Sequence, residues 1–335
     1  MINPVYSADE ARYEKGMIYR KAGNSGLKLP AVSLGMWHNF GDTAPLSRSR
    51  EILLSALDSG ITHFDLANNY GPSYGSAEST FGQVMASDLR PYRDEMIIST
   101  KAGFDMWPGP YGEGSSRKYL NASLDQSLKR MKLDYVDIFY SHRYDPETPI
   151  EETMQALVDI VKSGKALYVG ISNYPADKAA EAYRYLQDHD VHCLLHQGKY
   201  NMIFREAENN GVLDCTANAG VGYIAFSPLA QGLLTNRYFN GIPEGSRASV
   251  NFFLKKERIT EEVVAKLKKL DEIAASRGQS LAQMSLAWIL KNPNVTSVII
   301  GASSVAQLQD NIQAIKNTSF SQEECWAIDA QTYGL

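Results

Sequence analysis

Four side chains suited to acid–base chemistry follow short apolar runs of the sequence: Asp65, Tyr70, Lys101 and His142. A tyrosine with an ordinary pKa of about 10 is a weak proton donor at neutral pH. We expect the Lys101 ammonium to lower the pKa of Tyr70, and Asp65 to hold that ammonium in place. A histidine can orient a carbonyl by a hydrogen bond. The set therefore predicts protonation of an oxygen that gains negative charge, without a nucleophile or a metal ion.

Each of these residues alone also has a structural interpretation. A tyrosine in a glycine-rich loop usually packs, and Lys101 can lie at the surface. His142 can be a buried, hydrogen-bonded histidine, and Asp65 can cap a turn. We favour the chemical interpretation because all four follow consecutive strand candidates. A Schiff base on Lys101, as in a barrel aldolase, needs an uncharged lysine, which a nearby Asp65 opposes.

Eight short apolar, β-branched runs recur along the chain and predict strands. They span residues 31–36, 62–66, 96–100, 135–140, 166–171, 193–196, 222–226 and 297–300. Segments with helical periodicity lie between or after them, at 47–59, 120–131, 150–163, 176–188, 259–277, 281–290 and 305–315. Alternating strands and helices predict an α/β fold with a parallel sheet, and eight such units favour a closed (β/α)8 TIM barrel.

Two segments are additional to this repeat. Residues 17–20 and 27–29 flank a turn at Gly23-Asn24, which predicts an N-terminal β-hairpin that caps the bottom of the barrel. Residues 228–258, after the seventh strand, are too long for a simple connection and are rich in Gly, Asn and Arg. Loops of this length are usually functional. We expect one domain over residues 1–335.

The C-terminal ends of the strands carry many polar and aromatic residues. In a (β/α)8 barrel the active site lies at this rim. The residues there are Trp37-His38-Asn39, Asp65 with Asn68-Asn69-Tyr70-Gly71, Lys101, His142-Arg143, Ser172-Asn173, Gln197, Phe226-Ser227-Pro228 and Gly301-Ala302-Ser303. A barrel built only for stability does not require such residues at one rim.

The composition limits the function classes. The chain has 335 residues and a formal net charge of −5, which is unfavourable for a nucleic-acid partner. Cys193, Cys215 and Cys325 show no CxxC spacing, so a disulfide framework is not expected. The polar start has no signal-peptide core, and no apolar run is long enough to span a bilayer. We expect a cytoplasmic protein that binds no membrane.

Several motifs occur in an order that resembles the aldo-keto reductase superfamily. They are DLANNYG, STKAG, YSHR, VGISN, the strand that ends in Gln197, and FSPLAQG. The resemblance covers roughly residues 17–330 and is greatest to the branch of the potassium-channel β subunits and bacterial L-glyceraldehyde 3-phosphate reductases. Within this branch the chain is most similar to the reductases, on strings such as GMWHNFG, THFDLANNYGP and GKALYVGISNY. The resemblance implies reduction of small aldehydes to alcohols by hydride transfer from a nicotinamide cofactor.

The resemblance also implies a role for each matched residue. Tyr70 would be the general acid, tuned by Lys101 and Asp65, and His142 would direct the carbonyl toward it. The cofactor-binding positions would be Trp37, Asp65, Ser172, Asn173, Gln197, Phe226, Ser227, Leu229, Gln231, Arg237, Arg247, Gly301, Ser303, Gln307, Asp310 and Asn311. Among these, Phe226 would stack on the nicotinamide, and the segment from Gly301 would hold the adenosine end at a helix N-terminus.

One departure bears on the choice of cofactor. Close relatives often place Arg or Lys directly after the serine of the GAS motif, whereas this chain has Ser304. A 2′-phosphate would lose one cationic partner, worth about 1–3 kcal/mol as a charge-assisted hydrogen bond. NADP(H) remains the expected cofactor and NAD(H) the second choice. The residues left to hold the phosphate are Ser303, Ser304, Gln307 and Asn311.

The substrate mouth is expected to be lined by Trp37, His38, Tyr70, Trp107 and Arg143. Aromatic walls select small carbonyl compounds by shape. Arg143 can bind a phosphate or carboxylate, and a rim salt bridge is its alternative role. We expect activity on glyceraldehyde 3-phosphate, methylglyoxal and related short aldehydes. The alternative is a redox-sensing interaction module with slow turnover, like the channel subunits, and the resemblance implies a homo-tetramer or homo-octamer.

Overall fold

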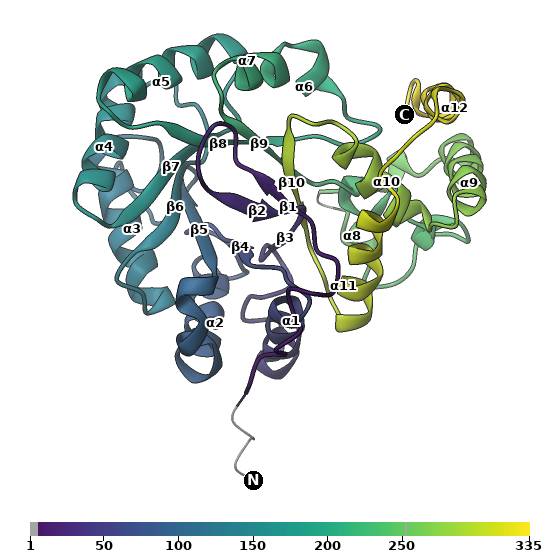
Figure 1. The fold of residues 1–335 in the computed structure, drawn as a ribbon, viewed down its shortest axis with the longest axis horizontal. Coiled ribbons are helices and arrows are strands. Elements are labelled where there is room, and N and C mark those ends of the chain that lie inside the picture. The colour runs from purple at the N-terminus through teal and green to yellow at the C-terminus, as the bar shows by residue number, and fades with distance from the viewer. Residues whose placement is uncertain (1–5, 252) are drawn as a thin grey trace.

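The computed structural model describes residues 6–251 and 253–335 (Figure 1). Eight parallel strands close in the order β10-β3-β4-β5-β6-β7-β8-β9, which confirms the (β/α)8 barrel. They are β3 (Val32–Gly35), β4 (His63–Asp65), β5 (Ile97–Ala102), β6 (Val136–Ser141), β7 (Ala166–Ser172), β8 (Cys193–Lys199), β9 (Gly222–Phe226) and β10 (Val295–Ile300). Every expected strand is present, with ends within three residues of the expected ones.

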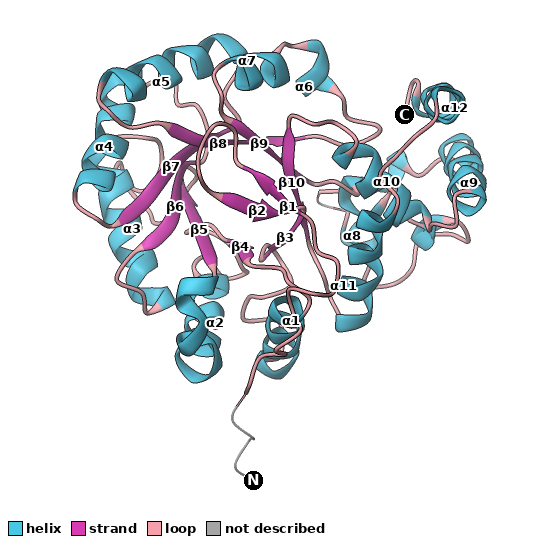
Figure 2. Cartoon of the chain, viewed as in Figure 1, coloured by secondary structure: helices cyan, strands magenta, loops and turns pink. Residues whose placement is uncertain are grey.

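Helices surround the barrel on its outer side (Figure 2). The expected ones are α1 (Leu46–Asp58), α3 (Arg117–Met131), α4 (Ile150–Lys162), α5 (Ala176–Asp188), α9 (Glu261–Ser276), α10 (Leu281–Leu290) and α11 (Val305–Ile312), which η6 (Gln313–Lys316) continues. Helices that the sequence pattern did not predict include α2 (Ser76–Val84) with η1 (Met85–Leu89) and η2 (Arg90–Glu95), α6 (Glu206–Asn209), α7 (Val212–Asn218) and α12 (Gln322–Thr332). No helix in the described ranges is both long and apolar enough to cross a membrane.

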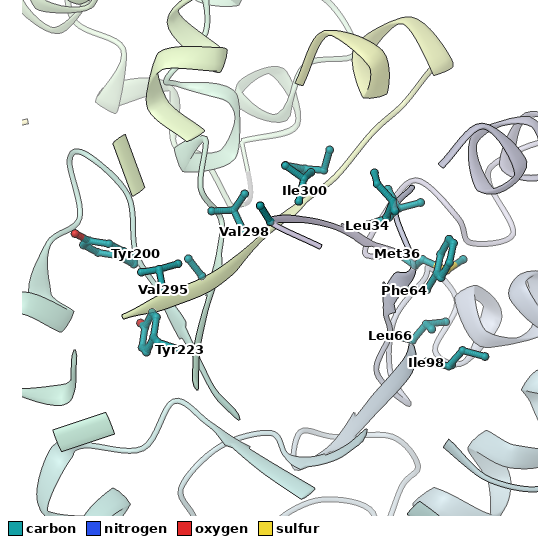
Figure 3. Packing of buried hydrophobic residues seen from close by; sticks show 14 of the residues in the cluster. Leu34, Met36, Phe64, Leu66, Ile98, Tyr200, Tyr223, Val295, Val298 and Ile300 are labelled. Atoms are coloured by element: carbon teal, nitrogen blue, oxygen red, sulfur yellow. The ribbon is translucent and has the colours of Figure 1, made fainter. Parts of the chain in front are cut away.

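Two apolar layers support the barrel. The larger one lies between the strands and the helices and includes Leu34, Phe64 and Val298 (Figure 3). Because successive side chains of a strand point to opposite faces, the neighbours of Phe64 point into the barrel. These neighbours are His63 and Asp65, which are both buried. The barrel interior near the site is therefore polar, with a separate small apolar cluster further along the barrel.

The N-terminal hairpin closes one end of the barrel, as expected (Figure 1). Its antiparallel strands are β1 (Tyr19–Lys21) and β2 (Lys28–Pro30). Arg20 donates hydrogen bonds of 2.7 and 2.8 Å to the carbonyls of Leu290 and Val295, at the start of β10. Gly23 has a φ of 55°, and a Cβ there would lie 2.1 Å from the Gly220 carbonyl oxygen, so the turn requires glycine.

The long connection after β9 is folded rather than irregular throughout. It contains the short helices η3 (Ala230–Gly232), η4 (Asn236–Tyr238), α8 (Arg247–Val250) and η5 (Lys256–Arg258). The ring of Phe253 lies 4.6 Å from that of Trp37 and 4.9 Å from that of His38, measured between centroids. The connection therefore folds over the rim beside the end of β3.

Candidate active site

A buried carboxylate–ammonium pair lies at the ends of two neighbouring strands. Lys101 Nζ on β5 donates to Asp65 Oδ2 on β4 at 2.7 Å and to the Leu66 carbonyl at 2.5 Å. Both side chains are almost completely buried. Burial lowers the pKa of Lys101, while the charge of Asp65 acts in the opposite direction. The ammonium thus has two of its three protons engaged, a pairing that opposes the uncharged lysine of a Schiff-base enzyme.

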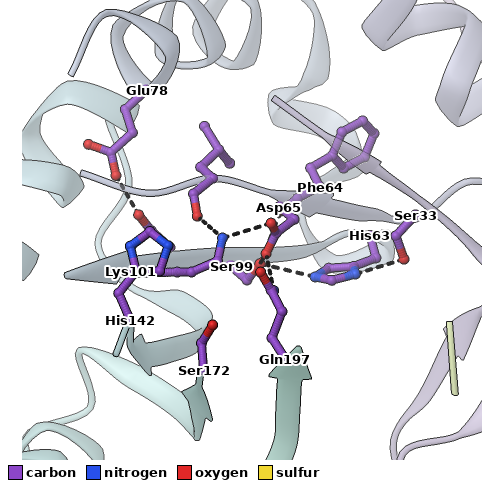
Figure 4. A network of polar contacts seen from close by, with 12 residues as sticks. Ser33, His63, Phe64, Asp65, Glu78, Ser99, Lys101, His142, Ser172 and Gln197 are labelled. Atoms are coloured by element: carbon purple, nitrogen blue, oxygen red, sulfur yellow. Dashed lines mark hydrogen bonds and ion pairs between the residues drawn. The ribbon is translucent and has the colours of Figure 1, made fainter. Parts of the chain in front are cut away.

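The Asp65 carboxylate accepts further hydrogen bonds from inside the barrel. Its Oδ1 accepts from Ser99 Oγ at 2.8 Å and from Gln197 Nε2 at 3.1 Å. Figure 4 shows these donors converging on Asp65 from different strands. Three donors to one carboxylate fix its orientation.

Tyr70 lies between Lys101, His142 and Trp37. The Lys101 Nζ is 4.8 Å from the centroid of the Tyr70 ring. The ring centroids of His142 and Trp37 lie 6.0 and 6.3 Å from it. The predicted acid–base set therefore meets in one place, and Tyr70 is its partly exposed member.

The pKa of Tyr70 differs from the expectation. Burial raises it well above the usual value, and the negative charge of Asp65 raises it further. The expected lowering of this pKa is wrong, because burial and the Asp65 charge both disfavour the phenolate and outweigh the effect of the Lys101 ammonium. Tyr70 thus stays protonated at neutral pH, and only a strong base such as a forming alkoxide removes its proton.

His142 follows β6 and faces Tyr70. Its ring packs edge-to-face on Phe104, with 4.7 Å between centroids. Burial lowers its pKa well below the usual value, and the charges of Lys101 and Arg143 lower it further. The imidazole is therefore neutral at neutral pH and can donate one hydrogen bond. Its Nδ1 is buried and has no hydrogen-bond partner within the described ranges.

The predicted substrate residues lie in two groups. The rings of Trp37 and His38 are in tilted contact, with 3.8 Å between centroids and 42° between their planes, next to Tyr70. Burial lowers the pKa of His38 to about 4, with a contribution from the Arg247 charge, so this ring is also neutral. Trp107 instead packs on Tyr119, at 5.1 Å between centroids.

Arg143 has defined contacts at the rim. Its Nε donates to the Gly103 carbonyl at 2.8 Å, and its guanidinium carbon lies 5.1 Å from the centroid of the Phe104 ring. The remaining end of the guanidinium forms a 3.2 Å ion pair with Glu113. The Glu113 side chain is 64% exposed, so this ion pair is weak and can be displaced by an anion.

Three of the predicted cofactor-binding positions lie toward the C-terminal ends of β7 and β8. Ser172 and Gln197 are buried and directly opposite each other in the two strands. Asn173 follows with a φ of 56° and donates to the His142 carbonyl at 3.1 Å. These polar groups and the Asp65–Lys101 pair therefore line one part of the rim.

The loop after β9 is held by its own polar contacts. Ser227 Oγ accepts from Gln231 Nε2 at 3.1 Å, and Arg247 donates to Gln231 Oε1. The Arg247 guanidinium carbon lies 5.6 Å from the centroid of the Trp37 ring. Phe226 and Leu229 are partly buried, and Arg237 is exposed on η4. The loop thus places a cation over the rim.

The segment at the start of α11 carries the predicted adenosine site. Ser304 caps the helix by accepting from the Gln307 amide at 3.2 Å. Gln307 Oε1 accepts from the Ser303 amide at 2.8 Å and from the Ser303 hydroxyl at 3.0 Å, and Gly301 is exposed. Asp310 accepts from Gln283 on α10 at 2.7 Å, so its carboxylate is engaged on the α10 side.

Asn311 provides an observation that fits a nucleotide. Its side chain is 1% exposed, and its Nδ2 has no hydrogen-bond partner among the residues that the structure describes. A buried donor without a partner costs stability unless a ligand or water accepts from it. Together with the α11 N-terminus and the cationic loop, this donor fits an elongated anionic cofactor.

Some polar residues inside the barrel support the site and were not predicted from the sequence. His63, Ser33 and Ser99 form hydrogen bonds that lead to Asp65. A signal was present, because His63 stands two residues before Asp65 and must share its face of the strand. Asn201, also missed, is fully buried and donates to the Ser227 carbonyl at 2.9 Å.

A (β/α)8 barrel with this acid–base group at its C-terminal rim defines the protein as an enzyme rather than a purely structural barrel. The chain also matches the model of the Aldo/keto reductase family over residues 31–332. It therefore belongs to the aldo/keto reductase family and is an oxidoreductase.

Similar proteins are found in bacteria and plants. The chain is 55% identical over 329 residues to the L-glyceraldehyde 3-phosphate reductase of Escherichia coli (strain K12), covering 97% of this chain and 95% of that protein. The reductase of E. coli O157:H7 is 56% identical over the same length and with the same coverage. A probable voltage-gated potassium channel subunit beta of Arabidopsis thaliana is 38% identical over 303 residues, with coverage of 89% and 91%.

Proposed function

We propose that the protein reduces small aldehydes to alcohols with NADPH, and that glyceraldehyde 3-phosphate and methylglyoxal are among its substrates. The observation that carries the proposal is the Tyr70 phenol beside the Asp65–Lys101 pair and the neutral His142. The identity of 55–56% to proteins named L-glyceraldehyde 3-phosphate reductase supports the substrate class.

In this mechanism His142 donates a hydrogen bond to the substrate carbonyl oxygen and orients it toward Tyr70. A nicotinamide cofactor held by the rim residues would be the source of the hydride for the carbonyl carbon. As the oxygen gains negative charge it becomes more basic than a phenolate, so Tyr70 releases its proton to it. Lys101 then stabilises the phenolate, and Asp65 keeps Lys101 charged. Solvent can return a proton to Tyr70 because this residue is partly exposed.

The cofactor would lie along the rim from Phe226 to Asn311. Phe226 would stack on the nicotinamide ring, and the amide and hydroxyl groups of Ser172, Asn173 and Gln197 would bind its carboxamide. The loop after β9 would cover the pyrophosphate with Ser227, Leu229, Gln231, Arg237 and Arg247. Gly301, Ser303, Gln307 and Asn311 would contact the adenosine end, with the contribution of Asp310 reduced by its bond to Gln283.

The direct test is steady-state oxidation of NADPH and of NADH with a panel of short aldehydes. We expect turnover within the usual enzyme range of about 1–10³ s⁻¹ with NADPH, and higher kcat/KM for glyceraldehyde 3-phosphate than for unphosphorylated glyceraldehyde. A turnover below about 0.01 s⁻¹ on every aldehyde would contradict the proposed aldehyde reduction. It would favour a second candidate function, that of a redox-sensing interaction module. The 38% identity to a probable channel subunit is the observation behind that candidate.

Ser304 gives a specific test of the cofactor. Replacing it in Ser304→Lys adds a cation near the expected 2′-phosphate, so the KM for NADPH should fall about tenfold and that for NADH should not change. Ser304→Ala is the matched control, because both variants lose the hydroxyl that caps α11. Equal behaviour of the two variants toward NADPH would place the 2′-phosphate elsewhere or exclude NADPH as the preferred cofactor.

We further propose that residues 1–335 form one domain that acts in the cytoplasm as a homo-tetramer or homo-octamer, without nucleic-acid or membrane partners. Light scattering of the purified chain measures the assembly. A monomer at micromolar concentration would contradict this part of the proposal without affecting the chemistry.

A further inference from the structure

A line of buried polar side chains crosses the barrel interior and ends at Asp65 (Figure 4). Ser297 Oγ lies 2.7 Å from Ser33 Oγ, which lies 2.9 Å from His63 Nδ1. On the other side of the ring, His63 Nε2 lies 3.0 Å from Ser99 Oγ, which donates to Asp65 at 2.8 Å. These side chains come from β10, β3, β4 and β5, and each is at most 1% exposed.

Each side chain in the line has a limited number of protons to donate, and this number determines which atom is the donor in every hydrogen bond of the line. An ionised carboxylate only accepts, so the single hydroxyl proton of Ser99 goes to Asp65. The Ser99 oxygen must then accept from His63, which places the ring proton of His63 on Nε2. A neutral imidazole has no second proton, so His63 Nδ1 accepts from Ser33, and Ser33 in turn accepts from Ser297.

The neutral state of His63 agrees with its surroundings. Burial lowers its pKa to about 4, and the Lys101 charge also acts to lower it, while Asp65 acts in the opposite direction. A protonated ring would have to donate from Nδ1 as well and would reverse the bonds to Ser33 and Ser297. At neutral pH all donors in the line therefore point toward Asp65 and polarise one another.

We propose that His63 is a positioning residue for the reaction: as the Nε2–H tautomer it holds the Ser99 hydroxyl on Asp65 and thereby keeps Lys101 charged beside Tyr70. This inference rests on the proposed function, because it assigns a support to the same acid–base site. The end of the line opposite Asp65 is Ser297, which is 0% exposed. The line therefore orients Asp65 and does not conduct protons from solvent.

Other charged and titratable groups also face the Asp65–Lys101 pair. Tyr70 and Tyr140 place their rings 4.8 and 5.8 Å from Lys101 Nζ. Glu78 on α2 acts to raise the pKa of Lys101, and the Lys101 charge lowers the pKa of His142. None of these groups donates a hydrogen bond to Asp65 within the described ranges. Weakening the Ser99 donor therefore acts on Asp65 directly and on Lys101 through it.

The tautomer is measurable without any assay of activity. Long-range ¹H–¹⁵N spectra of protein labelled at histidine distinguish Nε2–H from Nδ1–H rings, and the spectrum of His63→Phe assigns the signal. We expect an Nε2–H tautomer whose shifts stay constant between pH 6 and 9. An Nδ1–H tautomer, or a ring that titrates in this range, would overturn the proposal even if the protein proves to be the expected reductase.

Kinetics then test the positioning role. In His63→Phe the ring volume is kept and both hydrogen bonds are lost. We expect kcat at neutral pH to fall about tenfold, as for loss of one supporting hydrogen bond. We also expect the alkaline limb of the pH profile to move down by about one pH unit, because Lys101 loses its proton more readily when Asp65 is less firmly held. His63→Gln, which retains a donor toward Ser99, should recover most of both effects.

A second buried histidine provides the matched control. His196 on β8 is 1% exposed, and the Tyr183 hydroxyl lies 2.7 Å from its Nδ1. Its hydrogen-bond partner is thus Tyr183, which is not part of the line that leads to Asp65. His196→Phe should lower thermal stability and leave the pH profile unchanged. If the pH profile of His63→Phe superimposes on that of His196→Phe, His63 has only a structural role.

Ser33→Ala covers the case in which His63→Phe does not fold. This small change removes the donor to His63 Nδ1 and leaves the ring in place. We expect a smaller shift of the alkaline limb in the same direction. Its absence, in a folded variant with an unchanged His63 tautomer, would overturn the proposal.

Discussion

At the residue scale, the pKa of Tyr70 and the pKa of Lys101 have separate consequences. The sequence instead suggested that Lys101 acts by lowering the pKa of Tyr70. Tyr70 keeps its proton because burial and Asp65 raise its pKa. Lys101 has a pKa that burial lowers, despite the opposing effect of Asp65. The alkaline limit of activity is therefore expected to report loss of the Lys101 proton rather than ionisation of Tyr70. In the proposed mechanism the phenol would supply the proton, and the ammonium would determine the pH range in which it is supplied.

Arg143 is the residue whose role is most open to a kinetic test. If it binds the substrate phosphate, Arg143→Leu should raise the KM for glyceraldehyde 3-phosphate about 10–100-fold, as for loss of a charge-assisted hydrogen bond. The KM for methylglyoxal should change little. Glu113→Gln is the control, because it removes only the exposed partner of Arg143 and leaves the guanidinium available. Equal losses on both substrates would exclude the role.

Residue types and order were sufficient to predict that the proposed acid–base residues lie close together, since Asp65, Lys101 and His142 lie at the ends of successive strands. The direction of the Tyr70 pKa shift was not predictable, because it depends on burial and on which group neutralises Lys101. His63 was missed for a related reason. Its importance comes from side chains on three other strands that only the closed barrel brings together.

At the element scale, the hairpin of β1 and β2 is part of the barrel core rather than an appendage. Leu29 is 0% exposed and belongs to the apolar cluster inside the barrel, with Ile138, Leu195 and Ile224. The polar line at Asp65 lies further along the same interior. The hairpin thus keeps water out of the end of the barrel opposite the site.

Leu29→Ala tests this role. Deletion of a buried leucine side chain usually costs about 2–5 kcal/mol of unfolding free energy, which urea denaturation measures. The KM values should remain unchanged, since the site lies at the other rim. Leu27→Ala is a suitable control, because Leu27 packs on the same cluster but is only partly buried, and its loss should cost less. A substantial change in KM for Leu29→Ala would show that the two ends of the barrel are coupled.

Periodicity predicted the long helices and failed for particular elements. The helices α6 and α7 have four and seven residues, too few for a helical period to be evident. The helix α2 buries Glu78, which an ion pair of 2.7 Å with Arg130 on α3 makes favourable. A sequence pattern cannot show that pairing, because the two residues are distant in the chain.

At the scale of the whole molecule, buried neutral histidines make stability depend on pH. Burial lowers the pKa of His63 to about 4 and that of His196 to about 3, and it lowers the pKa of His142 well below its usual value. In the unfolded chain a histidine has a pKa of about 6.5. Below that pH the unfolded chain binds protons that the native state does not, so acid favours unfolding.

We therefore expect the unfolding free energy to be highest above pH 6.5 and to fall as the pH decreases from 6.5 toward 4. Each such histidine contributes a slope of about 1.4 kcal/mol per pH unit in this window. Denaturant titrations at several pH values measure the slope. His196→Phe should reduce it by one such contribution, and a slope equal to that of the unaltered protein would contradict the account for this residue.

The central claim is that the Tyr70 hydroxyl supplies the proton to the reduced carbonyl. Tyr70→Phe removes that hydroxyl and retains the ring that packs between Trp37 and His142. The most direct measurement is single-turnover reduction of glyceraldehyde 3-phosphate by the Tyr70→Phe variant, with the Kd of NADPH determined in parallel by fluorescence. The account predicts a fall in rate of about 10²–10⁴-fold with an unchanged Kd. A rate within a few-fold of that of the unaltered protein would contradict it.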